Sequence, residues 1–283
     1  MTSKAYAKIN LYLDVLGKRP DGYHDIVSIM KMIDIYDTVS VDLTGTGTIS
    51  VSCSDPSVPS DRRNTAYKCA ELFFETLGIP DPGISIMIEK RIPVSGGLAG
   101  GSSDGAQVLR ILKNMFSPEC PESTLYTIGA SVGADIPFCM RGGTAICTSK
   151  GDVTDTVPDV SNAYMILLVY GNGKISTGEA YAKIDRIRNR TRKTKIANRI
   201  LDDLENGRIP SLLYNIFEEA ADEDAHGIRR IKNIMYDNGA LSALMSGSGP
   251  TVFGLFESDD KIEAARKALE SEGFGCLTCR PVL

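Results

Sequence analysis

A glycine-rich segment at residues 93–104 carries the strongest chemical signal in the sequence. It reads Pro-Val-Ser-Gly-Gly-Leu-Ala-Gly-Gly-Ser-Ser-Asp, between an expected strand at 84–91 and an expected helix. Backbone N–H groups left uncovered by side chains, beside the positive end of a helix dipole, form a cradle for an anion. The segment therefore predicts phosphate binding, with a mobile loop as the alternative. Gly96 and Gly101 have Walker A spacing, but Ser102 stands where that loop needs a lysine, so another class of phosphate loop is required.

Two polar side chains near the start of the chain share one face of an expected strand. Residues 5–15 alternate between apolar and polar side chains, and this period of two is typical of a strand. Lys8 and Asn10 therefore point the same way, which makes them candidates for a site. For Asn10, ordinary polar packing is the alternative.

Three further segments have a structural interpretation beside a functional one. Asp135, a lone carboxylate between a glycine and a proline, is by itself more typical of a helix cap or turn than of a catalyst. Residues 246–251, Ser-Gly-Ser-Gly-Pro-Thr, are by themselves a tight turn between strands. In residues 19–25, Arg-Pro-Asp-Gly-Tyr-His-Asp, turn chemistry leaves Tyr23 and His24 unexplained, and both suit stacking on a base or hydrogen bonding to it.

Composition argues against several function classes. The 283 residues include 31 Lys and Arg against 36 Asp and Glu, a net charge of −5, so the broad basic surface of a nucleic-acid binder is not expected. No apolar run approaches the roughly 18 residues of a membrane span, and no secretory signal pattern is visible. Seven cysteines, an odd number, indicate reduced thiols, and two histidines offer little for a zinc site. We expect a cytoplasmic protein, monomeric or homodimeric, with a small-molecule partner and neither nucleic acid nor membrane.

The elements that must position these residues indicate an α+β protein of two domains. The chain becomes polar around 150–162, where we place the boundary between domains 1–155 and 156–283. After it, the order strand, helices, two strands, helix, strand is typical of a split β-α-β sandwich. Helices are expected at 64–77, with Asn64 as N-cap and Gly78 as the stop, from Ser102 or Ser103 onward, and at 122–133, 177–187, 194–205, 211–221, 225–238 and 259–272. Strands are expected at 36–43, 47–53, 84–91, 142–148, 164–170, 241–245, 251–256 and 276–282.

The four segments, in this order, resemble those of the GHMP kinases, the superfamily of galactokinase, homoserine kinase, mevalonate kinase and phosphomevalonate kinase. Within it, Ala-Tyr-Ala-Lys-Ile-Asn-Leu, Arg-Pro-Asp-Gly-Tyr-His and Gly-Ala-Asp-Ile-Pro-Phe are similar to the 4-diphosphocytidyl-2-C-methyl-D-erythritol kinases, and the second of these discriminates that family from its siblings. The resemblance spans nearly the whole chain. It implies a two-domain GHMP-kinase fold, with an N-terminal mixed α/β domain and a ferredoxin-like C-terminal domain. The implied reaction is ATP-dependent phosphorylation of the methylerythritol 2-hydroxyl, in non-mevalonate isoprenoid synthesis.

The resemblance also implies roles for single residues. Asp135 matches the aspartate that takes the hydroxyl proton, and Lys8 matches the lysine that pairs with it near the transferred phosphoryl group. Tyr23 matches an aromatic stacked on cytosine, His24 a reader of the base edge, and Tyr181 a second aromatic, whose alternative is an amphipathic helix residue.

The resemblance also matches further positions to substrate-binding and ATP-binding parts of the family's site. Mg²⁺ is expected to arrive with ATP, on its phosphate oxygens. Asn10 matches a substrate-side position, and Gly247 and Ser248 shape the site from the second domain. The positions matched to the ATP phosphate loop are Pro93, Gly96, Gly97, Leu98, Ala99, Gly100, Gly101, Ser102 and Ser103.

Two departures and two alternative functions stay open at this stage. The loop has Ala99 where the family usually has glycine, which costs about 1 kcal/mol if the position needs positive φ and bears on nucleotide affinity. A basic run at 186–195 is not required by the family, and a solvated surface is its ordinary interpretation, with an acidic partner or nucleic acid as the alternative. The alternative functions are a sibling kinase acting on another small alcohol and a non-catalytic nucleotide or metabolite sensor.

Overall fold

The computed structural model describes residues 1–158, 164–171, 176–187, 191–221 and 227–282, and it divides the chain into two compact units. The long strands β1 (Thr2–Lys18) and β2 (His24–Leu43) contribute residues to both units. The single boundary expected at 155–156 stays a prediction, because each unit is built from several segments. Unit 1 comprises residues 1–7, 35–94 and 99–141, and unit 2 comprises residues 8–34, 95–98 and 142–283.

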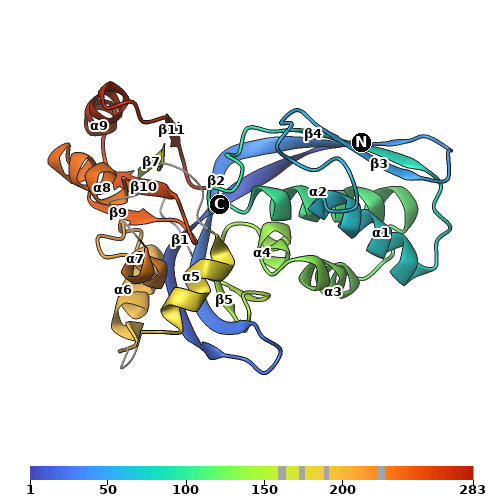
Figure 1. Ribbon diagram of the computed structural model, residues 1–283, viewed down its shortest axis with the longest axis horizontal. Helices are drawn as coiled ribbons and strands as arrows, with labels where there is room; N and C mark the ends of the chain where they lie inside the picture. Colours follow the sequence, from blue (N-terminus) through green and yellow to red (C-terminus); the bar gives the residue numbers. More distant parts are fainter. Residues whose placement is uncertain (159–163, 172–175, 188–190, 222–226, 283) are drawn as a thin grey trace. The chain divides into compact units, whose positions relative to one another are not determined.

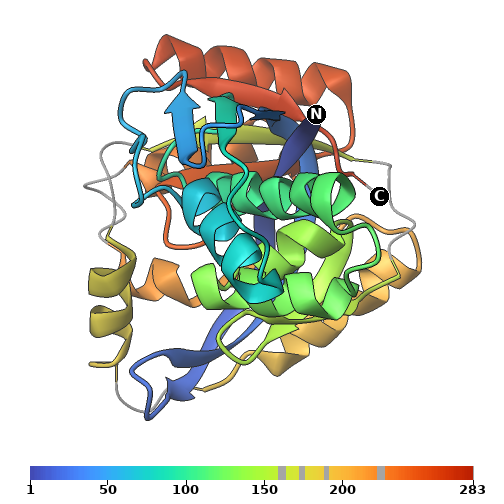
Figure 2. The same cartoon turned by 90° about the vertical axis from the view of Figure 1, so that its right-hand side faces the viewer.

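Unit 1 combines a small sheet with a group of helices. Its strands pair in the order β3-β4-β2, with β3 parallel to β4 and β4 antiparallel to β2. Four helices pack together on one face of these strands (Figures 1 and 2). The first of them begins at Asn64, whose side chain accepts from Ala66 N, and ends at the left-handed Gly78, as expected. The elements are β3 (Ile49–Cys53), β4 (Ile84–Glu89), α1 (Thr65–Leu77), α2 (Gly100–Phe116), α3 (Glu122–Val132) and α4 (Ile136–Arg141).

Unit 2 contains a four-stranded antiparallel sheet in the order β11-β7-β10-β9. Counted along the chain within this sheet, the order is fourth, first, third, second, which is the ferredoxin-like arrangement and confirms the expected split β-α-β domain. The helices α8 and α9 pack against its strands. The elements are β7 (Met165–Tyr170), α8 (Ile228–Asp237), β9 (Ser242–Met245), β10 (Thr251–Phe256), α9 (Asp259–Ser271) and β11 (Cys276–Cys279).

The remaining elements of unit 2 surround the parts of β1 and β2 that belong to it. The strand β8 runs parallel to β1, with Asn215 opposite Leu13, and β5 pairs with both β2 and β6. These pairings place Asn215 beside the strand that carries Lys8. The elements are β5 (Thr144–Thr148), β6 (Val153–Thr156), α5 (Thr177–Ile184), α6 (Thr194–Glu205), β8 (Tyr214–Asn215) and α7 (Ile216–Ala220).

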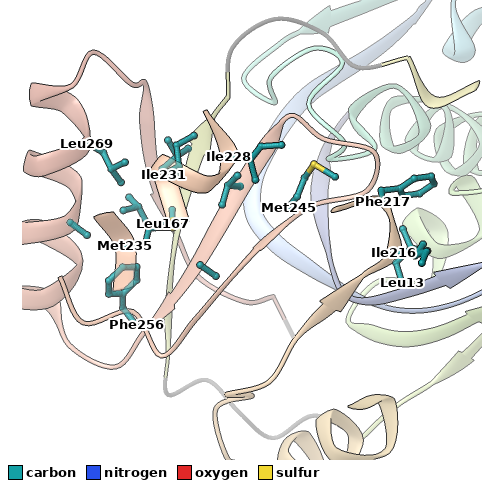
Figure 3. Close-up of a cluster of buried hydrophobic side chains, with 14 of the residues drawn as sticks. Leu13, Leu167, Ile216, Phe217, Ile228, Ile231, Met235, Met245, Phe256 and Leu269 are labelled. Carbon is teal, nitrogen blue, oxygen red and sulfur yellow. The ribbon is translucent and has the colours of Figure 1, made fainter. Parts of the chain in front are cut away.

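A single cluster of buried apolar side chains joins β1, α7 and the ferredoxin-like sheet within unit 2 (Figure 3). Leu13, Ile216, Phe217 and Met245 lie at one end of the cluster as drawn. The segments around β8 and α7 are therefore fixed by packing as well as by strand pairing.

The structure also bears on the cysteines, on membrane-spanning helices and on the basic run. All seven cysteines are free thiols. No helix in the described part of the chain is long and apolar enough to cross a membrane. Of the basic run 186–195, residues 188–190 lie outside the described residues, and Arg186, Arg192 and Lys195 are exposed.

Candidate active site

The glycine-rich segment leads into α2, and its last part lies in unit 1. Ala99 is the residue before the helix, with φ +57, and no side chain caps the first turn. The carbonyl of Ala99 accepts the first intrahelical bond, from Ser103 N at 2.9 Å. The N–H groups of the residues between them have no intrahelical partner, and at a positive helix end they suit phosphate oxygens. The condition stated for Ala99 is met, because this position has a positive φ.

The α3–α4 connection lies beside the first turns of α2 within unit 1. A Cβ built on Gly133 would lie 3.7 Å from Ser102 Oγ, and one built on Gly105 would lie 3.6 Å from a methyl group of Ile136. The carbonyl of Asp135 accepts from Cys139 N at 3.0 Å, so Asp135 immediately precedes α4. The structure thus brings the half-buried Asp135 segment to the N-terminal end of α2.

A buried charge cluster that sequence reasoning missed supports the same end of α2. Lys90 Nζ donates to Asp104 Oδ2 at 2.9 Å and also pairs with Asp37. Asp37 Oδ1 accepts from the N–H groups of residues 91 and 92 at 2.6 and 2.8 Å. Burial raises the pKa of Asp104 to about 7, against the opposing effect of the Lys90 ammonium. A Cβ on Gly100 would lie 3.1 Å from Lys90 Nζ, so the cluster packs directly under the loop.

The same end of α2 carries the hydroxyl of Ser103, which could donate a hydrogen bond to a ligand oxygen. The side chain of Ser103 is fully buried, and its Oγ has no hydrogen-bond partner in the part of the chain that the structure describes. Within the same residues, no group of three or more His, Cys, Asp or Glu side chains is arranged to hold a metal ion.

Lys8 lies in unit 2, against the part of the glycine loop that belongs to that unit. Its Nζ donates to Asn10 Oδ1 at 2.7 Å and to the carbonyl of Gly97 at 3.1 Å, and its own N–H donates to the carbonyl of Leu98. Ser246 Oγ donates to the same Gly97 carbonyl at 3.0 Å. The structure therefore gathers a buried ammonium, the glycine-rich loop and the turn after β9 around one carbonyl oxygen.

Asn10 is held in a chain of hydrogen bonds along β1. Its Nδ2 donates to Ser28 Oγ at 2.8 Å, and Ser28 Oγ donates to the carbonyl of Tyr12 at 2.7 Å. Both faces of β1 are buried over residues 7–15, so the polar face predicted from the alternation is an internal one. Asn10 therefore fixes the rotamer of Lys8, whose ammonium it accepts from.

His24 and Tyr181 lie in contact in unit 2, and their assignment to one base site stays a prediction. Their rings are stacked, with centroids 4.5 Å apart and an interplanar angle of 13°, and Tyr181 also contacts Phe217 edge to face. His24 Nε2 lies 2.9 Å from Asp185 Oδ1, and the hydrogen bond with His24 holds the pKa of the Asp185 carboxyl below its usual value. Asp185 was missed, although it follows Tyr181 by four residues and so shares its helix face.

Tyr23 and Ser248 lie outside the contact between the His24 and Tyr181 rings. The Tyr23 side chain is exposed, with Lys150 Nζ 5.3 Å from its ring centroid, and it makes no ring contact with His24 or Tyr181 in the described structure. Ser248 Oγ lies 2.9 Å from Thr177 Oγ1, at the start of the helix that carries Tyr181. The turn after β9 thus connects the Lys8 cluster with the helix of the His24 cluster.

The predicted residues fall into the two units as follows. Within unit 2 the structure brings together Lys8, Asn10, Gly97 and the 246–249 turn, and separately His24 with Tyr181. Within unit 1 it brings the start of α2 close to the segment that contains Asp135. The pairing of Lys8 with Asp135 stays a prediction. The loop positions divide along the chain, with Gly96, Gly97 and Leu98 in unit 2 and Pro93, Ala99, Gly100, Gly101, Ser102 and Ser103 in unit 1.

Comparison with protein families and curated proteins gives consistent matches. The model of the GHMP kinases N terminal domain matches residues 64–143, and that of the GHMP kinases C terminal domain matches residues 198–275. A 4-diphosphocytidyl-2-C-methyl-D-erythritol kinase of Clostridium kluyveri is 41% identical over 270 residues, 93% of each chain. One of Clostridium botulinum (strain Kyoto / Type A2) is 41% identical over 266 residues, again 93% of each chain.

Solved structures resemble the chain along its whole length. A 4-(cytidine 5'-diphospho)-2C-methyl-D-erythritol kinase aligns with a TM-score of 0.79 and 28% identity over 99% of both chains. A homoserine kinase from Cytophaga hutchinsonii aligns with a TM-score of 0.77 and 18% identity, over 100% of this chain and 95% of that one. A mevalonate kinase from L. major aligns with a TM-score of 0.75 and 17% identity, over 99% and 96% of the two chains. The last two likenesses show the fold alone.

Proposed function

The chain belongs to the GHMP kinases and, within them, to the 4-diphosphocytidyl-2-C-methyl-D-erythritol kinases, and from this premise we propose a role for each part of the candidate site. The enzyme is an ATP-dependent small-molecule kinase of isoprenoid precursor synthesis. In the proposed reaction the 2-hydroxyl oxygen of the methylerythritol portion forms a bond to the γ-phosphorus of ATP. The bond from that phosphorus to the β,γ-bridging oxygen breaks, ADP leaves, and the hydroxyl proton passes to a base.

The start of α2 and the preceding loop bind the ATP phosphates in this proposal. The uncapped first turn of α2 and the left-handed Ala99 leave backbone donors in place for phosphate oxygens. The hydroxyl of Ser103, buried without a partner among the described residues, supplies an additional hydrogen-bond donor at the same helix end. A Mg²⁺ ion that arrives with ATP would partly neutralise the phosphate charge at this loop.

Asp135 and Lys8 divide the acid–base and electrostatic work. Asp135, at the phosphate-loop end of α2, takes the proton of the attacking hydroxyl. The Lys8 ammonium, fixed by Asn10 and the Gly97 carbonyl, stabilises negative charge on the transferring phosphoryl group. A buried, oriented ammonium needs no reorganisation during the reaction, which is why its fixed position matters.

His24 and Tyr181 bind the cytosine base in this proposal, and Tyr23 supplies a further aromatic surface. If Nε2 of His24 donates to Asp185, its Nδ1 is an acceptor, which suits the exocyclic amine that cytosine presents. Uracil has a carbonyl oxygen at that position, which is an acceptor and cannot form a hydrogen bond with the acceptor Nδ1 of His24. Asp185 thereby contributes to the choice of base through the tautomer of His24.

One observation carries the proposal for phosphoryl transfer. The Lys8 ammonium donates a hydrogen bond of 3.1 Å to the carbonyl of Gly97, in the glycine-rich loop. The test measures ADP release with Mg·ATP on 4-diphosphocytidyl-2-C-methyl-D-erythritol, methylerythritol phosphate, homoserine and mevalonate, each alone. We expect turnover only with the cytidylated alcohol. Turnover with another alcohol would keep the transfer chemistry and remove the base assignment of His24, and binding of ATP without turnover on any alcohol would favour a sensor.

The assignments of compartment and assembly also stay proposals. The protein works in the cytoplasm on a small-molecule substrate, as a monomer or homodimer and without nucleic acid. Gel filtration and a salt-dependent gel shift test the last two statements.

A further inference from the structure

The turn at residues 246–249 touches the carbonyl that holds the Lys8 ammonium. A Cβ built on Gly97 would lie 2.1 Å from the carbonyl oxygen of Ser246, so the two backbones are in direct contact there. A Cβ on Gly247 would lie 3.1 Å from the Gly97 carbonyl oxygen and 3.6 Å from Lys8 Nζ. With no side chain between them, a shift of the turn moves the Gly97 carbonyl, and with it the hydrogen-bond acceptor of Lys8.

The Asn215 side chain holds this turn in place through hydrogen bonds to its backbone. It is buried, and its Nδ2 donates to the carbonyls of Met245 and Gly247, each at 2.7 Å. Its Oδ1 accepts from Phe217 N at 3.0 Å, which caps α7. Both amide protons and the amide oxygen are thus engaged, and the two carbonyls lie on either side of Ser246 in the chain.

Asn215 is itself attached to rigid surroundings. It pairs through β8 with Leu13 of β1, and its neighbours Ile216 and Phe217 are part of the buried cluster that also contains Met245 (Figure 3). Glu218, on the next turn of the chain, accepts from Met245 N at 2.8 Å and gives the same strand end a second attachment. The turn is therefore positioned against β1, the strand that carries Lys8.

We propose that Asn215 is a positioning residue for phosphoryl transfer, acting through the 246–249 turn and Gly97 on the Lys8 ammonium. It touches none of the reacting groups and works by fixing two backbone carbonyls. The inference rests on the proposed role of Lys8. A purely structural role, in which Asn215 only caps α7, makes a different prediction for variants that keep the cap.

Two substitutions separate these roles. Ser and Asp are good N-cap residues, so Asn215→Ser and Asn215→Asp keep an acceptor for Phe217 N, while both remove the pair of amide donors to the turn. The matched control is Asn238→Ser, which removes an amide donor to the carbonyl of Ile234 in the same unit, at the end of α8. Folded enzyme is quantified by near-ultraviolet circular dichroism, and kcat is expressed per folded molecule.

We expect kcat of both Asn215 variants to fall about 10- to 100-fold, as for displacement of a reacting or stabilising group by a fraction of an ångström to 1 Å. The KM for the cytidylated alcohol should change less than kcat, because both variants keep the cap on Phe217, which contacts Tyr181, and the turn reaches the helix of Tyr181 through the Ser248–Thr177 contact at its start. Asn238→Ser should stay within about twofold of wild type in both constants. Hydrogen exchange of the peptide covering 246–249 should quicken in the Asn215 variants only.

The outcomes are distinguishable. Suppose that wild type turns over the alcohol and that the kcat values of Asn215→Ser and Asn215→Asp equal that of Asn238→Ser. This result would overturn the positioning role and leave the proposed function intact. Wild type without turnover would overturn the proposed function and this inference together. If neither Asn215 variant folds, Ser246→Ala decides, because it removes only the hydroxyl bond to Gly97: a fall in kcat supports the inference, and unchanged kcat contradicts it.

Discussion

Replacing Ala99 by glycine should stabilise the protein, against the usual effect of that substitution. Ala99 precedes α2 with φ +57 and ψ 28, a left-handed conformation that glycine adopts without strain. No side chain caps the helix there, so the change removes no hydrogen bond. The loop keeps its shape, because the backbone already has the conformation that glycine prefers.

The magnitude follows from two opposing terms. Relief of left-handed strain at a residue with a Cβ is worth roughly 1–2 kcal/mol. Glycine gains conformational entropy in the unfolded chain, which costs roughly 0.4–1 kcal/mol. We therefore expect Ala99→Gly to raise the free energy of unfolding by about 0.5–1 kcal/mol, with the KM for ATP unchanged within about twofold.

The assay is urea unfolding followed by circular dichroism, with Ala264→Gly as the matched control. Ala264 is exposed in the interior of α9, where the same change should lower the free energy of unfolding by about 1 kcal/mol. The two variants should thus differ in sign. If Ala99→Gly destabilised the protein as much as Ala264→Gly does, the strain assigned to position 99 would be refuted.

Three further predictions concern the site. Asp135→Asn should leave ATP binding by calorimetry nearly unchanged while ADP release falls by about 100-fold or more, and unchanged turnover would exclude Asp135 as the base. His24→Ala should raise the KM for the cytidylated alcohol and spare that for ATP; an effect on ATP alone would contradict the base site. Burial raises the pKa of Asp104 to about 7, so its contribution to stability is full below about pH 4 and is lost as pH rises toward 7. Asp104→Asn should therefore resist urea better than wild type at pH 7.5, with a smaller advantage at pH 5, and the reverse trend would show that the carboxylate form is the favoured one.

Local sequence signals placed most of the elements correctly, because they act through neighbouring residues. The asparagine and glycine at the two ends of α1 cap it as expected, and the helix expected at 194–205 and the strand expected at 251–256 have those bounds. The helix after the loop begins at Gly100 rather than at Ser102 or Ser103, because Ala99, and not a serine, occupies the left-handed position before it. The sequence signal for a serine cap is strong, but here the loop conformation decides.

The elements missed are those whose formation depends on distant partners. The strand β8 was taken as part of a helix expected at 211–221, and it exists because its two residues pair with β1. The strand β6 lies in a polar stretch read as a boundary, and it forms by pairing with β5. The short helix α4 is a local exception, because Asp135 just before it is typical of a turn as well as of a helix cap. Pairing across such distances is not encoded in local periodicity.

The same distinction separates the predicted site residues from the missed ones. Lys8, His24 and Tyr181 stand in motifs, and their neighbours along the chain suffice to mark them. Asp185 and Asn215 lie outside every motif, and each acts through partners that are not its neighbours in the sequence: Asp185 through His24, and Asn215 through the carbonyls of Met245 and Gly247. Motifs therefore mark the groups that we propose to meet the substrate, whereas the fold is needed to identify the groups that hold them in place. For this chain, variants of Asn215 and Asp185 test the folded arrangement more directly than variants of Lys8, because a Lys8 variant removes the proposed charge itself rather than its position.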